Sequence, residues 1–217
     1  MTTSGAASSA VDRKGVKSLV PVRTQQAVVT MGIFGAALVV IQLVNMITSY
    51  WLVDHLGIVP RTVHGLIGIA TAPLIQTGWG HLLANIIPLL VFGFLVLAGG
   101  VRQFVAVTVL VWVISGFGVW LTAGTNSITV GASGLVFGYL TYLVARGFFS
   151  RKVSQILIGL VLLAIWGGIF WGLLPGSNGI SWQGHLFGAL GGLLAAFLAS
   201  KADGPVRKSA PSSVAGG

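Results

Sequence analysis

Long uncharged apolar stretches recur along almost the whole of this 217-residue chain. Six of them are long enough to cross the hydrocarbon core of a bilayer as helices, which takes about 17–25 residues. The six stretches run approximately from Ala27 to Trp51, Gly80 to Ala98, Phe104 to Leu121, Thr129 to Ala145, Val153 to Leu174 and Trp182 to Ser200. The pattern predicts an all-α membrane protein built as a bundle of six transmembrane helices.

The composition excludes several classes of protein. Hydrophobic residues make up 55% of the chain and charged residues only 7%, which rules out a soluble domain. There is no Cys, so disulfides, thiolate zinc sites and cysteine nucleophiles are excluded. There is also no Glu, and the three carboxylates, Asp12, Asp54 and Asp203, lie near a chain end or in a loop. We expect neither a metal nor an organic cofactor.

The segments outside the six stretches fall into two kinds. A long first loop from Leu52 to Trp79 contains an apolar patch, Gly65 to Ile75, which at about eleven residues is too short to span and indicates an interfacial or re-entrant segment. The two tails, 1–26 and 201–217, are rich in small, polar and basic residues and are expected to be disordered. The membrane domain is therefore predicted to cover residues 27–200.

The distribution of Lys and Arg predicts the orientation. Arg61 alone falls on the side that we expect to be outside. The other basic residues are Arg13, Lys14, Lys17 and Arg23 in the N-terminal tail, Arg102 in the second loop, Arg146, Arg151 and Lys152 in the fourth, and Lys201, Arg207 and Lys208 in the C-terminal tail. We therefore expect a multi-pass protein of the cell membrane with both termini in the cytoplasm. The net charge of +9 follows from this bias and does not indicate binding of nucleic acid.

Four polar residues on three stretches are expected at one depth. The second, fourth and sixth stretches all enter from the outer face, and His81, Asn85, Ser133 and His185 lie near their outer ends. With a rise of 1.5 Å per residue, each lies roughly 2 to 8 Å inside the boundary. Polar side chains at such a depth are costly and usually face a packed interior or a water-filled cavity. The four side chains can therefore converge on one site.

Glycines near these residues have the spacing that lets membrane helices approach closely. We assign to helix packing at the site Gly131, Gly134, Gly138, Gly184, Gly188 and Gly192. Because the chain contains 32 Gly, such pairs also arise without any catalytic role.

The residue types suit acyl transfer. A serine hydroxyl becomes a nucleophile when a neighbouring base takes its proton, and the imidazole of His185 is the candidate base for Ser133. No carboxylate lies in any predicted span, so a serine hydrolase would have to use a Ser-His dyad. His81 and Asn85, four residues apart on one helix face, could form the oxyanion hole with the Ser133 backbone N–H. The alternatives are that Ser133 and Asn85 only join helices and that His81 is an interfacial histidine.

These residues form three motifs that resemble those of the rhomboid family of intramembrane serine proteases. The motifs are His81-x-x-x-Asn85, Gly131-x-Ser133-Gly134, and His185 with Gly188 and Gly192, in that order on the second, fourth and sixth stretches. The resemblance extends from the first stretch to the last. It implies the six-helix rhomboid-like fold, endopeptidase activity on membrane-spanning proteins, the Ser133 and His185 dyad, and oxyanion roles for His81 and Asn85.

Two features depart from the family pattern. Many members carry a Trp-Arg pair in the first loop, where this chain offers only Pro60-Arg61. Many also have a Tyr four residues after the nucleophile, where this chain has Phe137, which keeps the ring but not the hydroxyl. By the same resemblance the fifth stretch, with Trp166, Phe170 and Trp171, is either a movable wall for substrate entry or a lipid-facing aromatic surface.

Other functions remain to be separated from this one. An inactive rhomboid-like protein could bind single-span or other transmembrane proteins without cleaving them. A small transporter would be indicated by paired ionisable residues or inverted repeats, and the sequence has neither. Zinc or two-aspartate intramembrane proteases are excluded by the absence of Glu and of suitably placed Asp. The sequence leaves the physiological substrate and the oligomeric state open.

Overall fold

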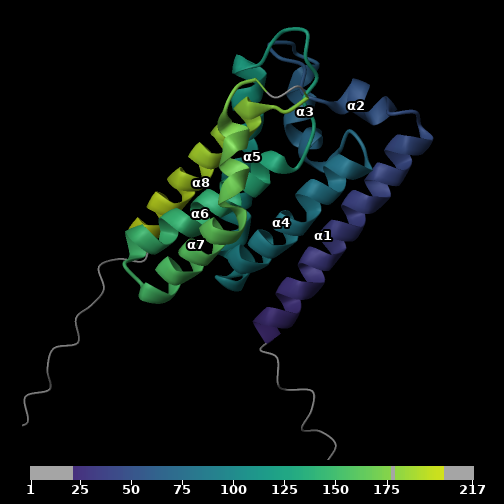
Figure 1. Ribbon diagram of the computed structural model, residues 1–217. Helices are drawn as coiled ribbons and strands as arrows, with labels where there is room; N and C mark the ends of the chain where they lie inside the picture. Colours follow the sequence, from purple (N-terminus) through teal and green to yellow (C-terminus); the bar gives the residue numbers. More distant parts are fainter. Residues whose placement is uncertain (1–21, 177–178, 203–217) are drawn as a thin grey trace, which may run out of the picture.

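The computed structural model describes residues 22–176 and 179–202, which form a bundle of helices (Figure 1). The long helices are α1 (Val22–Ile47), α4 (Trp79–Ala98), α5 (Val101–Thr122), α6 (Ser133–Ser150), α7 (Val153–Trp166) and α8 (Trp182–Ala202). The short ones are α2 (Trp51–Leu56), α3 (Gly65–Thr71) and the 3₁₀-helices η2 (Ala72–Leu74) and η3 (Gly167–Leu173). No strand occurs within the described residues.

Five helices within the described ranges are long and apolar enough to cross a membrane. They are Thr24–Ile47, Trp79–Ala98, Val101–Thr122, Val153–Leu173 and Trp182–Ala202. The chain is therefore an all-α, multi-pass membrane protein, and five of the six apolar stretches read from the sequence correspond to these helices.

Helix α6, the fourth predicted span, is not among the five. Its polar residues, which include Ser133, Thr141 and Arg146, lower its average apolar character. It packs against α4, α5, α7 and α8, and 11 of its 18 residues are buried. By contrast, only 11% of the most apolar stretch within Val153–Leu173 is buried. A helix enclosed by other helices needs little apolar surface of its own, which explains why its composition is the least lipid-like.

The backbones of α6 and α8 are in direct contact where the two helices cross. A Cβ atom added at Gly188 would lie 2.2 Å from the carbonyl oxygen of Gly134, and one added at Gly192 would lie 2.0 Å from that of Gly138. No side chain fits at Gly188 or Gly192 without moving one helix away from the other. Small residues at such crossings let membrane helices approach closely.

The segment between α1 and α4 packs over the upper end of α5. Ile58 pairs with Thr129 in an antiparallel β-bridge, and Trp112 donates a hydrogen bond from Nε1 to the Ile69 carbonyl at 2.7 Å. The Arg61 guanidinium donates to the Leu121 carbonyl at 3.0 Å, near the end of α5. A cation at that place satisfies an otherwise unpaired helix carbonyl. The Arg of Pro60-Arg61 thus ties this segment to α5.

Several predicted boundaries differ from those observed. Helix α1 begins at Val22 rather than Ala27, and α6 runs from Ser133 to Ser150 rather than from Thr129 to Ala145. The short predicted patch is divided between α3 and η2. Most of both predicted tails, 1–21 and 203–217, lies outside the described residues.

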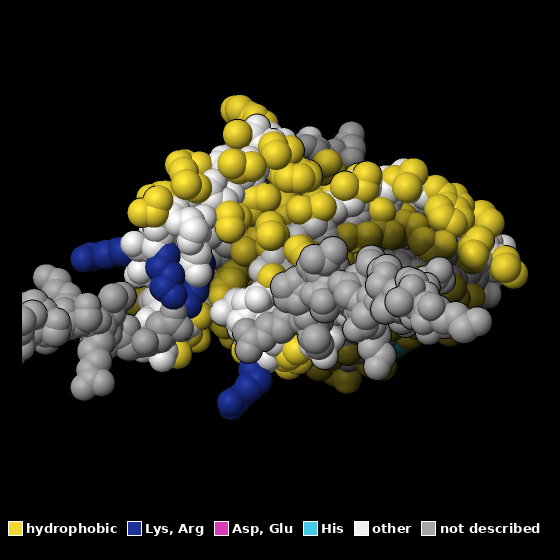
Figure 2. Space-filling model, turned by 90° about the horizontal axis from the view of Figure 1, so that it is seen from below, with side chains coloured by type: hydrophobic (Ala, Val, Ile, Leu, Met, Phe, Trp, Pro, Cys, Tyr) yellow, Lys and Arg dark blue, Asp and Glu magenta, His cyan; other side chains and the backbone are white. Residues whose placement is uncertain are grey.

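Both described ends, the start of α1 and the end of α8, lie at the lower end of the bundle in Figure 1. The α4–α5 and α6–α7 turns, with Arg102, Arg151 and Lys152, are at the same end. Figure 2 views this end and shows several Lys and Arg side chains, with no Asp or Glu of the described residues in sight. Apart from Arg61, the basic residues that the structure describes therefore lie at one end of the bundle.

The glycine contact can be tested by Gly188→Ala, with Gly184→Ala as the matched control on the same helix. At Gly184 the nearest atoms to an added Cβ are 3.4 Å away, which is ordinary contact. We expect Gly188→Ala to lower the free energy of unfolding by about 1–3 kcal/mol through overpacking. Gly184→Ala should change it by less than about 1 kcal/mol. Thermal unfolding in detergent measures both, and equal stability of the two variants would contradict the packing.

Candidate active site

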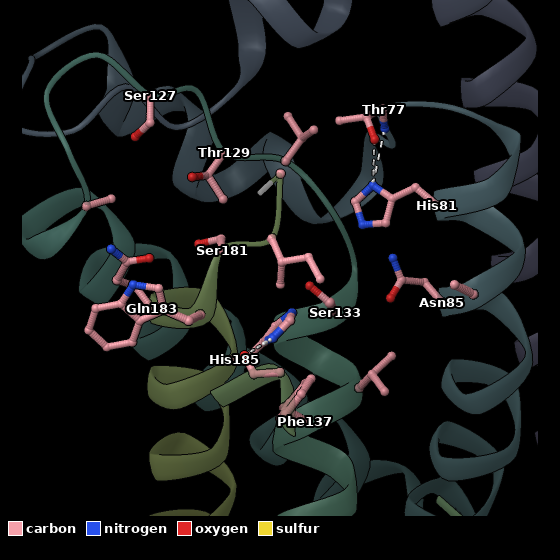
Figure 3. Close-up of a pocket in the computed structure, with 18 of the residues that line it drawn as sticks. Thr77, His81, Asn85, Ser127, Thr129, Ser133, Phe137, Ser181, Gln183 and His185 are labelled. Carbon is pink, nitrogen blue, oxygen red and sulfur yellow. Dashed lines mark hydrogen bonds between the residues drawn. The ribbon is translucent and has the colours of Figure 1, made fainter. Parts of the chain in front are cut away.

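The four polar residues singled out in the sequence line one cavity of about 800 Å³ (Figure 3). His81 and Asn85 come from α4, Ser133 from the start of α6 and His185 from the first turns of α8. Several residues between α5 and α6 and those from Gly179 to Gln183 also line it, together with Thr77. The side chains of Ser133 and His185 lie next to each other in this cavity.

Ser133 is the first residue of α6. The carbonyl of Ala132 accepts the N–H groups of Leu135 at 3.0 Å and Val136 at 3.1 Å, so the hydrogen-bond ladder of the helix begins after Ser133 and Gly134. The first N–H groups of a helix have no partner within it and carry the positive end of its dipole. The local structure therefore presents the Ser133 hydroxyl together with donors suited to a developing oxyanion.

The chain before Ser133 is fixed by backbone hydrogen bonds to the segment between α1 and α4. Gly131 donates its N–H to the Ala72 carbonyl at 2.9 Å. Gly131 has a φ of +129°, which other residues rarely adopt, and an added Cβ would lie 2.7 Å from the ring of His81. The assignment of Gly131 to helix packing is thus corrected: it lies in the turn before α6, and its small size makes room for His81.

His185 lies in the capped first turn of α8, and two contacts hold its ring in one orientation. Ser181 caps α8 by accepting the Gly184 N–H at 3.2 Å. The ring of His185 stacks on that of Phe137, with centroids 4.1 Å apart and an interplanar angle of 10°. Its Nδ1 lies 2.9 Å from the carbonyl oxygen of Gly172. Because a carbonyl only accepts, Nδ1 carries a proton, and in the neutral imidazole Nε2 then has the lone pair that a base needs.

His81 has the opposite tautomer. The backbone N–H of Thr77 points at His81 Nδ1 over 3.3 Å, and the Thr77 hydroxyl lies 3.0 Å from the same nitrogen. Because an N–H only donates, Nδ1 accepts, and the proton is on Nε2. His81 therefore offers a hydrogen-bond donor, whereas His185 offers an acceptor.

Asn85 is buried and belongs to a chain of amides. Its Nδ2 donates to Gln76 Oε1 at 3.0 Å, and Asn45 Nδ2 donates to the Gln76 carbonyl at 2.9 Å. Asn45 and Gln76 are fully buried. Buried polar groups of this kind usually hold one another in a single arrangement. This network fixes which way the Asn85 amide faces.

Three of these residues were not found from the sequence. Gly172 contributes only a backbone oxygen, which leaves no trace in the choice of residue. Gln76 lies in a segment whose path the sequence does not predict. Asn45 could have been found, because it is an amide within an apolar stretch of the sequence, and such a group is costly to bury without a partner.

Taken together, the cavity holds a hydroxyl, a neutral imidazole with a free lone pair beside it, and donors from α4 and α6. These are the groups that are required for attack on a carbonyl carbon and for stabilisation of the resulting oxyanion. The described residues contain no group of three or more His, Asp or Glu that could hold a metal ion.

Comparison with known proteins identifies the family to which the chain belongs. The family model of the Rhomboid domain matches residues 63–202. An uncharacterised protein of Mycobacterium tuberculosis is 43% identical over 175 residues, which covers 77% of this chain and 72% of that protein, and a Mycobacterium bovis protein matches equally. An uncharacterised Mycobacterium leprae protein is 40% identical over 180 residues, or 79% and 71% of the two chains. Because the Rhomboid domain model matches more than half of the chain, the chain belongs to the rhomboid family.

Proposed function

We propose that this protein is an intramembrane serine endopeptidase that cleaves transmembrane proteins near the outer face of the cell membrane with a Ser133 and His185 dyad. The observation that carries the proposal is the pair of opposite histidine tautomers around Ser133. The histidine beside the hydroxyl has a free lone pair, and the histidine across the cavity has a free N–H. Membership in the rhomboid family gives the same activity as its general expectation.

In this mechanism His185 Nε2 removes the proton from Ser133 Oγ as the oxygen attacks the substrate carbonyl. The oxyanion of the tetrahedral intermediate accepts hydrogen bonds from the Ser133 N–H, from His81 Nε2–H and from the second N–H of Asn85 Nδ2, whose first N–H is donated to Gln76. His185 then gives its proton to the leaving amide nitrogen, and a water molecule activated by the same imidazole hydrolyses the acyl-enzyme.

The Gly172 carbonyl takes the orienting place that a carboxylate has in a triad. It holds the Nδ1–H of His185, at 2.9 Å, and favours the imidazolium that forms during the reaction. A carbonyl dipole is weaker than a full charge, but it needs no ionised group within the membrane. Stacking on Phe137 restrains the same ring without any hydroxyl.

The membrane arrangement that we propose has six spans, with α6 as the enclosed one and both termini in the cytoplasm. Hydrolysis within a membrane needs water, and the polar lining of the cavity, which includes Ser127, Thr129, Ser181 and Gln183, is suited to hold it.

Transmembrane substrates would enter past the helix pair α7 and η3. This pair is the least enclosed of the apolar spans, and Trp171 is 76% exposed. Trp166 and Phe170, by contrast, pack edge-on against Phe92 and Phe137. These two inward contacts are the ones that substrate entry would have to open.

The chemistry is tested with a single-span substrate and the purified protein in bilayers. Ser133→Ala and His185→Ala should each reduce cleavage by about a thousandfold or more, and the double variant should be no worse, because nucleophile and base act as a unit. Asn85→Ala should be milder, at about 100-fold. Gly184→Ala serves as the folding control. Cleavage by Ser133→Ala at the native rate would exclude the mechanism. If the native protein cleaves nothing, the alternative of an inactive protein that only binds transmembrane proteins would be favoured.

The orientation is tested by cysteine labelling, for which the chain is suited because it has no native Cys. A Cys at exposed Asn126 should react with a membrane-impermeant maleimide added to intact cells. A Cys at exposed Lys152 should react only after the cells are opened. Labelling in the reverse order would contradict the proposed topology.

Substrate choice follows from the cost of unwinding a helix in lipid, where freed backbone groups find few new partners. We expect cuts near the outer boundary, at small residues followed by Gly, Pro or polar residues. Replacing the Gly or Pro of a substrate by Leu should slow cleavage, as followed by mass spectrometry of the products. Equal rates across such a series, or cuts near the cytoplasmic boundary, would refute this expectation.

A further inference from the structure

A second cavity lies at the end of the bundle opposite the candidate active site. Its volume is about 370 Å³, within the range of about 300–1,000 Å³ that is typical of small-ligand pockets. It is formed by the α4–α5 turn, the last turns of α6 and the start of α7. The polar side chains that line it are Gln103, Tyr142, Arg146, Lys152 and Gln155.

The polar lining is rich in hydrogen-bond donors. Arg146 and Lys152 are cations whose side chains carry N–H donors and no acceptor. The side-chain oxygen of Gln155 already accepts the Ser150 hydroxyl at 2.5 Å, so its amide group has mainly N–H to offer. No carboxylate lines the cavity, and the only one among the described residues, Asp54, is on α2 at the other end. Such a lining suits an anion whose oxygen atoms accept hydrogen bonds and donate none.

The two cations are placed differently. Arg146 is 7% exposed and lines the cavity with a guanidinium, a group suited to hydrogen bonds with phosphate oxygens. Lys152 is exposed, in the turn between α6 and α7. One cation thus lies inside the cavity and one on the outer surface, an arrangement that suits a charged group inserted from the membrane surface.

Apolar side chains complete the lining. Leu95, Leu143 and Ile158 line the same cavity, and Ile158, on the sparsely covered helix α7, is 41% exposed. The cavity therefore lies beside the outer surface of the bundle that faces the acyl chains. The Lys and Arg side chains in Figure 2 gather at this end, where the charge pattern places the cytoplasmic leaflet with its anionic lipids.

We propose that this cavity binds a phosphate group, carried by the head group of an anionic phospholipid or by a soluble phosphate compound. Arg146 and Lys152 neutralise the charge and Gln155 adds a neutral donor. For a phospholipid, the acyl chains follow Ile158 along α7. The site is separate from Ser133 and does not depend on proteolysis.

The test uses the full chain in a maltoside detergent, which carries no phosphate, and follows thermal unfolding. Three additives are compared: phosphatidylglycerol, diacylglycerol with the same acyl chains, and inorganic phosphate. We expect phosphatidylglycerol to raise the unfolding temperature more than diacylglycerol does. A rise with inorganic phosphate as well would identify soluble phosphate as a further source, and a rise with phosphatidylglycerol alone would identify the lipid.

Variants assign the effect to the cavity. Lys152→Gln should raise the concentration of phosphatidylglycerol at half-maximal shift about fivefold, as expected for one cation near a membrane surface. Arg146→Gln should abolish the shift. Arg102→Gln, which removes an exposed charge at the same end but outside the cavity, should respond as the native protein does. Because Lys152 is exposed, its variant remains informative if Arg146→Gln does not fold.

Two results would overturn the proposal. One is an equal shift with phosphatidylglycerol and diacylglycerol, together with no shift with inorganic phosphate. The other is an equal response of Lys152→Gln and Arg102→Gln.

Discussion

The close approach of α6 and α8 is the constraint on which the candidate site depends. Gly188 and Gly192 leave no space for a side chain against the carbonyls of Gly134 and Gly138, so the two backbones meet directly. Ser133 begins α6 one residue before this contact, and His185 lies one turn before Gly188 on α8. The crossing that packs the helices therefore also sets the hydroxyl and the imidazole beside each other. Any widening of the crossing would separate them.

The candidate site contains no buried ion pair within the described part of the chain. None of the described residues that line it is a carboxylate, and its two histidines differ in tautomer because one faces the Gly172 carbonyl and the other the Thr77 N–H. Backbone groups thus assign the acceptor to one ring and the donor to the other. This arrangement avoids the free-energy cost of burying an ionised side chain in the membrane. The backbone dipoles that it uses belong to a 3₁₀-helix and a turn that are present in any case.

Polar groups are concentrated where other helices cover them. Helix α6 carries Ser133 and Arg146 at its two ends and lies between α4, α5, α7 and α8, while the apolar α7 is the most lipid-exposed of the spans. One enclosed helix therefore contributes to both cavities, the candidate active site at one end and the cation-lined cavity at the other. The surrounding apolar helices make it possible for this helix to carry polar residues.

The sequence alone determined the helical membrane class, because apolar length and the absence of charge follow directly from the bilayer as a solvent. Its motifs also named Ser133, His185, His81 and Asn85 as one set, because residues at the same depth on helices of the same direction can meet. Only the tertiary structure decided the tautomers, the place of Gly131 beside His81, and the partners Gly172, Gln76 and Asn45. These depend on backbone groups and on irregular turns between helices, whose paths are set by long-range contacts that no local pattern of residues encodes.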